Sequence, residues 1–382
     1  KMGGGLMQLV AYGAQDVYLT GNPQITFFKV VYRRHTNFSM EAIEQTMNGS
    51  VAGGARTTVT ISRNGDLVHR MYLAGTLAAT NVINGPARDI SSIEVEIGGQ
   101  RIDKHFGHWM EVWAELVENK TGQGVGTLFQ NMSGMGCGVA SNTATAFADA
   151  AAGDQAMFSV LDLESNKVTV PLQFWFCRNP GLALPLIALQ YHEVKIIFEW
   201  ATTLSGVAGD YKLWADYIYL DTDERRRFAQ VSHEYLIEQL QFQSEGTATS
   251  HNLNFNHPVK ELIWTGGFAN GQPVAFNGWA TGDTFRLTLN GHDRFADRFT
   301  QYFTRTQVWQ HHSGHGGLVE NSIAVYSFAL KPEEHQPSGT CNFSRIDNAQ
   351  LKCSRTTPLH IYAVNYNVLR IMSGMGGLAY SN

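Results

Sequence analysis

The sequence predicts an all-β protein that contains two similar domains in tandem. Stretches in which apolar and polar residues alternate recur along the 382 residues, whereas helical periodicity is scarce. The 38 glycines, together with many Thr, Val, Phe and Tyr residues, indicate strands joined by tight turns. Two pairs of segments also repeat in order at nearly one spacing, and a chain of this length favours more than one core.

Seven segments combine this alternation with an ordinary strand length and are bounded by Gly, Pro, Asn or Asp. They are residues 57–62, 92–99, 167–176, 193–200, 285–291, 321–330 and 359–369. Two helices are predicted beside them, at residues 105–118 and 295–303. The first helix has one apolar face, made by Phe106, Met110, Trp113 and Val117.

The duplication rests on two matches within the chain. Residues 41–50 resemble residues 235–244, and both contain Ile-Glu-Gln, which begins at Ile43 and Ile237. Residues 95–109 resemble residues 287–303, because each has a strand, a glycine turn, an arginine and then an aromatic segment. The spacings are 237 − 43 = 194 and 289 − 97 = 192, so two independent matches predict one duplicated architecture.

Two segments are predicted to lie outside the cores. The boundary between the domains is expected near residues 220–230, where Asp-Glu-Arg-Arg-Arg indicates a solvated turn and not a nucleic-acid patch. Residues 121–155 are rich in Gly, Ala, Ser and Thr and carry almost no charge. Because a long surface insertion costs little stability, we predict an elaborated surface loop there.

The composition argues against several classes of protein. A formal net charge of −5 gives the chain no overall electrostatic footprint for nucleic acid, so the basic run around Arg33 and Arg34 is local. Four cysteines without CxxC spacing predict buried thiols, not a zinc ribbon. The longest apolar stretch is interrupted by Arg178 and Pro180, and no secretory signal is recognised, so we expect a soluble protein. With only 16% charged residues, the chain is also expected to bury part of its outside against neighbours.

No constellation of catalytic or metal-binding residues is recognised. His192-Glu193 and His233-Glu234 open like a zincin motif, but neither pair has a second histidine four residues after the first. Three histidines, His311, His312 and His315, lie in a glycine-rich loop, and we expect no carboxylate or cysteine partner near them, so adventitious metal binding is the most we expect. We therefore predict no catalytic residues, no cofactor and no metal site.

One asparagine of the chain is a candidate for glycosylation. Five asparagines begin an Asn-x-Ser/Thr pattern: Asn37, Asn48, Asn119, Asn131 and Asn342. Asn131 lies within the predicted surface loop and is the candidate site for a glycan.

Several long segments carry a resemblance to a known family. Seven segments resemble the major capsid protein of large icosahedral double-stranded DNA viruses: residues 3–38, 62–68, 93–106, 180–195, 216–230, 326–349 and 365–380. The likeness is strongest to the phycodnavirus branch and spans both halves of the chain. The insertion at 121–155 and the short loops at 266–283 and 304–320 depart from the family pattern.

The resemblance implies a double jelly roll, that is, two tandem antiparallel eight-stranded β-sandwiches with short helices in loops. Residues 1–26 are then expected to be an N-terminal assembly arm. Residues 27–222 form the first jelly roll, with the insertion loop 121–155, and residues 223–382 form the second. The first strand of the first roll is expected at residues 38–46, after a strand-like run from Phe28 to Arg33.

The implied function is that of a major capsid protein in the outer icosahedral capsid of the virion, made in the host cell cytoplasm. Three chains would form a pseudo-hexagonal capsomer. The implied partners are the other two chains, neighbouring capsomers, and minor capsid, cement and penton proteins. Direct contact with nucleic acid is not expected, and contact with an inner viral membrane is at most indirect. The alternatives are a lectin-like carbohydrate-binding β-sandwich, which would need no trimer, and a jelly-roll enzyme of glycan metabolism, which would need convergent carboxylates.

Overall fold

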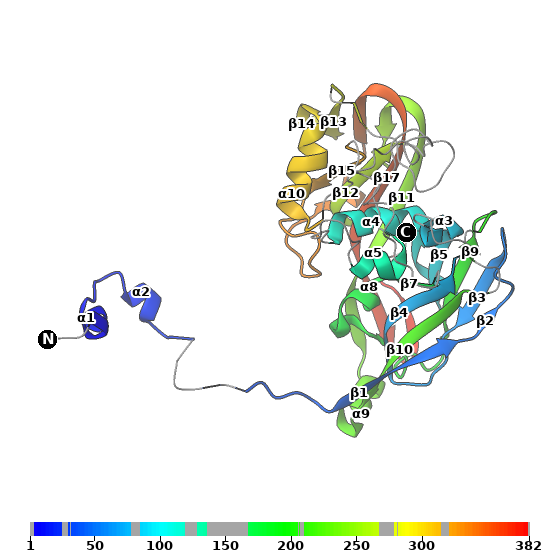
Figure 1. The fold of residues 1–382 in the computed structure, drawn as a ribbon, viewed down its shortest axis with the longest axis horizontal. Helices are drawn as coiled ribbons and strands as arrows, with labels where there is room; N and C mark the ends of the chain where they lie inside the picture. The colour runs from blue at the N-terminus through cyan, green and yellow to red at the C-terminus, as the bar shows by residue number, and fades with distance from the viewer. Residues whose placement is uncertain are drawn as a thin grey trace, which may run out of the picture. The chain divides into compact units, whose positions relative to one another are not determined.

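The computed structural model divides the chain into two compact units, Lys1–Asn37 and Phe38–Asn382 (Figure 1). The residues that it describes are 4–24, 30, 32–77, 85–118, 128–135, 167–204, 206, 210–266, 279–280, 282–314 and 321–380. The side chains of residues 130 and 131 also lie outside this description.

The N-terminal unit contains two short helices, α1 (Gly4–Val10) and α2 (Val17–Thr20). The turn between them is closed by Asp16, whose Oδ2 accepts a hydrogen bond of 2.7 Å from the amide of Gly13. Neither helix has a buried residue. The predicted strand around residues 28–33 falls mostly outside the described residues, and residues 32–37 have no regular secondary structure.

In the described residues of the first roll, the strands form two antiparallel sheets of five strands each. One sheet has the order β1-β10-β4-β7, with β8 on β4, and the other has the order β2-β3-β9-β5-β6. The strands are β1 (Phe38–Gln45), β2 (Met47–Asn48), β3 (Arg56–Thr60), β4 (Leu67–Thr76), β5 (Ile90–Ile97), β6 (Gln100–Phe106), β7 (Lys167–Pro171), β8 (Leu184–Pro185), β9 (Val194–Trp200) and β10 (Lys212–Leu220).

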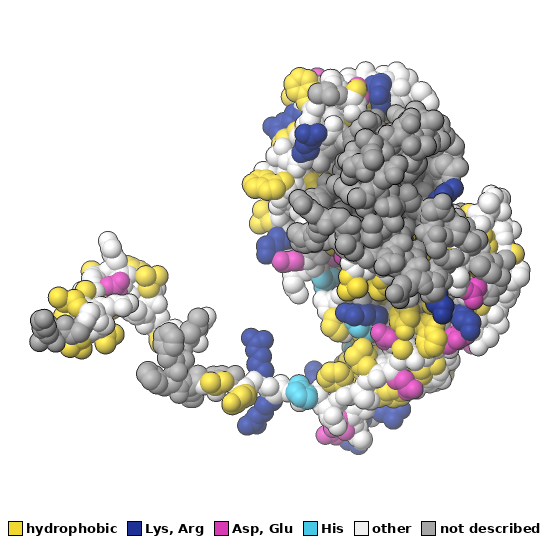
Figure 2. All heavy atoms as spheres, in the orientation of Figure 1, with side chains coloured by type: hydrophobic (Ala, Val, Ile, Leu, Met, Phe, Trp, Pro, Cys, Tyr) yellow, Lys and Arg dark blue, Asp and Glu magenta, His cyan; other side chains and the backbone are white. Residues whose placement is uncertain are grey.

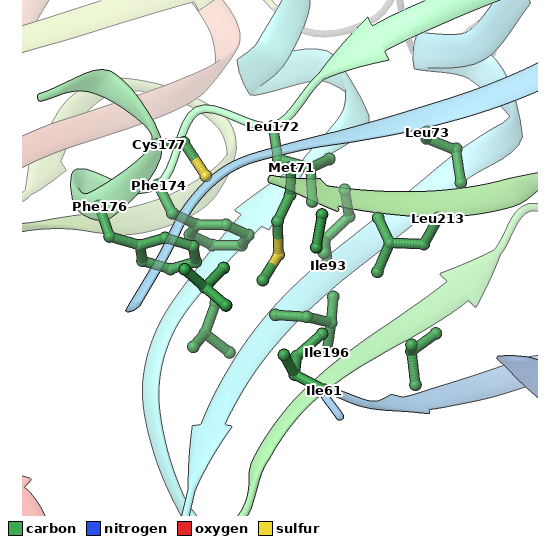
Figure 3. Packing of buried hydrophobic residues seen from close by; sticks show 14 of the residues in the cluster. Ile61, Met71, Leu73, Ile93, Leu172, Phe174, Phe176, Cys177, Ile196 and Leu213 are labelled. Atoms are coloured by element: carbon green, nitrogen blue, oxygen red, sulfur yellow. The ribbon is translucent and has the colours of Figure 1, made fainter. Parts of the chain in front are cut away.

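The core of the first roll lies between these sheets. Alternate residues of each strand point to one face, so Leu73 and Leu213 of one sheet meet Ile93 and Ile196 of the other (Figure 3). Its helices are α3 (Gly85–Asp89), α4 (Gly107–Val117), α5 (Leu128–Ser133), α8 (Trp175–Arg178) and the 3-10 turn η1 (Pro180–Leu182).

The second roll is one continuous antiparallel sheet of eight strands in the described part of the chain. Its elements are β11 (His233–Asn252), β12 (Pro258–Gly266), β13 (Thr284–Leu289), β14 (His292–Phe299), β15 (Ile323–Ser327), β16 (Cys341–Asn342), β17 (Ala349–Met372), β18 (Met375–Leu378), the π-helix η3 (Tyr302–Thr306), α10 (Gln307–His311) and the 3-10 turn η4 (Phe343–Arg345).

The long strand β17 supplies both layers of this roll. Residues 359–365 lie between β11 and β12, whereas residues 349–353 pair with β13. The sheet therefore folds into a β11-β17-β12-β15 layer and a β14-β13-β17 layer, and Trp264 and Phe285 meet in the core between them. The two rolls together make a double jelly roll, as the sequence predicted.

The predicted duplication is confirmed. Ile43 lies in β1 and Ile237 in β11, which are the first strands of their rolls. The second match is a hairpin followed by a helix in both rolls: β5-β6 precedes α4, and β13-β14 precedes η3 and α10. Both hairpins turn through two residues of positive φ, Gly98-Gly99 and Asn290-Gly291, which suits the twist of the paired strands.

Three local predictions are wrong. Residues 295–299 belong to β14, because Phe295 enters the core from a strand paired with β13, and the helix begins only after Phe299. The strand predicted to 176 ends at Pro171, and Trp175–Arg178 is helical. The predicted turn at 220–230 contains the exposed helix α9 (Thr222–Gln230), whose first amide donates to the Asp221 carboxylate at 2.7 Å.

The predicted surface loop at 121–155 lies outside the described residues except for 128–135. Within that segment Ser133, Gly134 and Met135 are buried, and Met135 packs in the core of the first roll. The surface prediction is therefore wrong for these three residues. The helix predicted at 105–118 is confirmed as α4.

Helix α4 is buried between the two rolls (Figure 1). Its residues Trp109, Val112, Trp113 and Leu116 pack on the second roll against Ile263, Ile323, Val325, Tyr362 and Val364. The neighbouring residues in β12, Leu262 and Trp264, point into the core of the second roll. The β11-β17-β12-β15 layer is therefore covered on both faces, one of them by the first roll.

A loop of the second roll caps the C-terminal end of α4. The amide of Gly314 donates to the carbonyl of Leu116 at 2.7 Å, and Ser313 Oγ donates to the carbonyl of Val117 at 2.9 Å. Carbonyls at a helix C-terminus have no partner within the helix, so these bonds satisfy groups that burial would otherwise leave unpaired. A Cβ at Gly314 would lie 2.5 Å from the carbonyl oxygens of both Glu115 and Leu116.

We expect Gly314→Ala to destabilise the protein by about 1–3 kcal/mol, because backbone atoms of α4 or of the loop must move to admit the methyl group. Gly246→Ala is the matched control, since a Cβ there meets nothing within 4 Å. Thermal unfolding of both variants measures the difference. Equal midpoints for the two variants would show that the loop does not fix α4.

Candidate assembly surfaces and the contact between the rolls

The histidines singled out in the sequence are not brought together by the fold. His192 Nδ1 lies 3.0 Å from the carbonyl of Gly376, and His233 Nε2 lies 2.9 Å from the carbonyl of Phe228. His311 Nδ1 is 3.1 Å from the carbonyl of Leu330, and His315 lies outside the described residues. In the described part of the chain, no group of three or more His, Cys, Asp or Glu residues is placed to hold a metal ion.

His312 has carboxylate neighbours that the sequence did not reveal. Its Nε2 lies 3.0 Å from Glu261 of β12, and its Nδ1 lies 3.1 Å from Glu333. Burial alone would lower the pKa of His312, but the two carboxylates raise it to about 9. The expectation that no carboxylate lies near this histidine is therefore wrong, and the group is a buried ion pair beside the loop that caps α4.

A second buried group of charges joins the two rolls. Glu238 of β11 accepts from Arg178 of the first roll at 2.5 Å and from Lys260 of β12 at 2.6 Å. Burial would raise the pKa of Glu238, but Arg178, His335 and Lys260 hold it at about 2. Lys260 also donates to the carbonyl of Pro332, and its ammonium lies over the ring of Tyr366.

A β-bulge explains how two adjacent charged residues both serve this contact. Val259 and Leu262 both face the core of the second roll, although they are three positions apart, because the register of β12 shifts between Val259 and Glu261. The side chains of Lys260 and Glu261 therefore both lie outside the core of the second roll, on the side that faces the first roll. Sequence reasoning missed this cluster, although Glu238 belongs to the repeated Ile-Glu-Gln.

Neutral aromatic groups fill the interface next to these charges. His108 at the start of α4 makes a hydrogen bond of 2.5 Å with the Tyr362 hydroxyl, and its ring lies 5.0 Å from that of Phe242. Burial, together with the neighbouring His360, lowers the pKa of His108 to about 3. Burial also lowers the pKa of His360 to about 4. Both imidazoles are therefore uncharged at neutral pH.

Large apolar side chains are exposed on both units. In the N-terminal unit they are Leu6, Met7, Leu9, Val10, Tyr12, Val17, Tyr18, Leu19, Val30 and Tyr32. In the body, Trp309 of α10 and the neighbouring Leu330 are 81% and 76% exposed, and Figure 2 shows hydrophobic side chains at this edge of the second roll. Exposed groups of this kind indicate contact surfaces.

The edges of the sheets offer further surface. Strand β1 pairs only with β10 in the described part of the chain, and its residues from Phe38 to Ala42 are exposed. An open groove of about 750 Å³ lies between β6 and β11, and Lys104, Phe106, Phe242 and Gln243 contribute to its walls. Free strand edges are places where another chain can add to a sheet.

The glycosylation candidate, Asn131, lies on α5, but its side chain is outside the described residues. None of the helices described reaches the length and apolar character needed to cross a membrane.

We expect Glu238→Gln to destabilise the folded chain by about 3–5 kcal/mol, because it removes the carboxylate that pairs with the buried Lys260 and the partly exposed Arg178. Glu334→Gln is the control, since Glu334 makes an exposed pair with Lys331, and solvent screens such a pair, so little change in stability is expected. Chemical denaturation of both variants tests this. A loss below that of the control variant would show that Glu238 does not hold the rolls together.

The stability that His312 contributes should depend on pH. Its pKa is raised from 6.5 to about 9 in the folded chain, so the contribution is complete below pH 6.5 and is lost as the pH rises through 9. The full loss is about 3 kcal/mol. Denaturation midpoints from pH 6 to 10 should fall more steeply for the wild type than for His312→Gln, with exposed His292→Gln following the wild type. Parallel curves for the wild type and His312→Gln would contradict the buried ion pair.

Comparison with known proteins connects this fold to one family. The family model described as "Major capsid protein N-terminus" matches residues 26–221, and the model of the "Large eukaryotic DNA virus major capsid protein" matches residues 224–377. The major capsid protein of Pyramimonas orientalis virus is 53% identical, and that of Paramecium bursaria Chlorella virus 1 is 44% identical. Both matches cover all of this chain and all of the relative.

Solved structures agree with this relationship. A chain of the quasi-atomic model of the PBCV-1 virus capsid superposes with a TM-score of 0.74 and 37% identity, covering 94% of this chain and 100% of that chain. The Faustovirus major capsid protein, at 12% identity, shares the fold with a TM-score of 0.64 and 94% coverage of each chain. The lectin-like alternative is not favoured by these matches. The chain belongs to the family of major capsid proteins of large eukaryotic DNA viruses.

Proposed function

We propose that this chain is the subunit of a trimeric capsomer, and that such capsomers tile the icosahedral shell of a large double-stranded DNA virus as pseudo-hexagonal blocks. The observation that supports it most directly is the duplicated roll. Helix α4 of the first roll packs on the second roll, so one chain presents two similar units joined by a buried contact. A hexagonal lattice needs six similar units around each block, and three doubled chains supply six. Relatives over the whole length are named as major capsid proteins, which also favours a structural role over an enzymatic one.

The proposed organisation of the chain is an assembly arm at residues 1–26, a first roll at 27–222 and a second roll at 223–382. The matched family ranges, 26–221 and 224–377, support these limits. The compact units divide at Asn37 instead, so residues 27–37 lead from the arm to β1. For the arm we propose contact with neighbouring capsomers or with minor capsid, cement or penton proteins.

The proposed location is the outer capsid of the virion, with synthesis in the host cell cytoplasm. A net charge of −5 supports the absence of direct contact with the genome. Contact with an inner viral membrane is proposed to be at most indirect.

We expect the purified protein to be a trimer of about 127 kDa, three times the chain mass of 42.3 kDa. Its interfaces should lie in the obligate range, on the order of 2,000–5,000 Å² each. Native mass spectrometry at micromolar concentration measures this. A stable, folded monomer under those conditions would end the capsomer proposal.

Removing residues 1–26 should leave the trimer intact but prevent shell formation. Each exposed apolar side chain of the arm contributes roughly 1–2 kcal/mol when a partner buries it, whereas ordering the arm costs about 1–2 kcal/mol per residue. The arm should therefore be ordered only in the shell, and hydrogen exchange on free trimers and on intact particles compares the two states. Equal protection of the arm in both would assign it to the fold of the single chain.

A further inference from the structure

We propose that α10 of one copy docks through Trp309 on the outer face of the β1-β10-β4-β7 sheet of the next copy, beside Tyr72 and Trp214. This inference rests on the proposed trimer and assigns the surfaces that form it. The contact would be the between-chain counterpart of the contact that α4 makes between the two rolls of one chain.

The contact within the chain provides the template. Helix α4 follows the β5-β6 hairpin of the first roll and packs on the outer face of the β11-β17-β12-β15 layer of the second roll. Trp109 and Trp113 carry that contact, and both are 4% exposed. Close by, Arg178 of the first roll reaches Glu238 on β11.

The duplication supplies a second copy of each half of this contact. Helix α10, with η3, follows the β13-β14 hairpin, as α4 follows β5-β6. The β1-β10-β4-β7 sheet has the same order as the β11-β17-β12-β15 layer. In each, the first strand of the roll pairs with the late strand β10 or β17, this strand pairs with β4 or β12, and β4 or β12 pairs with β7 or β15. Within one subunit α10 packs on η3 and β15 of its own roll, with Val308 in the same buried cluster as α4, so its exposed Trp309 stays available.

Matched residues of the two halves differ in burial. Trp309, 309 − 113 = 196 positions after Trp113, is 81% exposed. The side chain of Glu44, which matches Glu238 in the repeat, is 44% exposed, whereas that of Glu238 is 3% exposed. Two positions that the contact within the chain buries, Trp113 and Glu238, therefore have counterparts that one subunit leaves open, Trp309 and Glu44.

The receiving face carries groups suited to a tryptophan. Tyr72 and Trp214 are paired across β4 and β10, alternate with core residues Leu73 and Leu213, and stack with ring centroids 6.4 Å apart. In the second roll, Tyr366 occupies the place of Trp214, because Tyr366 pairs with Glu238 as Trp214 pairs with Glu44. Tyr366 is buried, whereas Trp214 is only half-buried. A stacked aromatic pair is a favourable platform for a third ring.

Such a contact joins two different surfaces and therefore closes into a ring only at a fixed number of copies. One rotation relates the first roll to the second within a chain, and another relates the second roll to the first roll of the next chain. If these two rotations are similar, the six rolls of three chains close the ring. A contact of α10 with another α10 would instead give a dimer.

The first test is the assembly state of Trp309→Glu. Because Trp309 is exposed in the subunit, the variant should fold, and hydrogen exchange in β12 and β17 should match that of the wild type. We expect the concentration at which the trimer dissociates to rise by at least about tenfold, since buried tryptophans are common hot spots. Tyr191→Ala, which removes another exposed aromatic ring outside both surfaces, should leave it unchanged.

The second test is cross-linking with a short bis-maleimide. The double variant Trp309→Cys/Tyr72→Cys should give covalent dimers and trimers, whereas each single variant should give neither. Retention of the trimer by Trp309→Glu, or cross-linking by Trp309→Cys alone, would overturn the assigned contact while leaving the capsomer proposal standing. A wild-type chain that is monomeric would overturn both, so the two failures are distinguishable.

Discussion

The architecture of this chain depends on a sheet that is buried on both faces. The β11-β17-β12-β15 layer faces its own roll's core on one side and α4 of the first roll on the other. A sheet in that position cannot keep the usual polar outer face, which is why β12 is buried along almost its whole length. Separating the rolls would expose Trp109, Trp113 and Ile263 together, so the two rolls form one structural unit.

Polar groups within this interface fix its geometry. Burying Glu238 and Lys260 is favourable only if their charges and hydrogen bonds are satisfied. The bulge in β12 places Lys260 and Glu261 so that both find partners. An apolar contact tolerates sliding, whereas a set of directed bonds between two rolls does not. For a subunit that must fit a lattice, a fixed angle between its rolls is a functional property.

Much of the architecture could be predicted from the sequence, because half-buried strands alternate and the hairpins of both rolls carry their turn residues at matching positions. The alternation of residues 92–99 and 359–369 identified β5 and part of β17 directly. Strand β12 was not recognised, because a strand buried on both faces shows a continuous apolar run with two charges. Residues 295–299 were misread as helical, since Phe295 and Phe299 suit either periodicity and only pairing with β13 decides. The family was predicted, but not the contacts of Glu238 or His312, because these join residues far apart in the chain.

The course of β17 has a consequence for synthesis of the protein. Leu369 and Ile371, near its end, complete the core of the first roll, while residues 349–353 of the same strand close the second. Neither roll can therefore finish its core until the last part of the chain has left the ribosome, so folding is dominated by contacts of high sequence separation. A chain that stops before β17 lacks part of the core of each roll. We expect such a fragment to be excluded from a shell, because two incompletely packed rolls cannot keep the fixed arrangement that a lattice position requires.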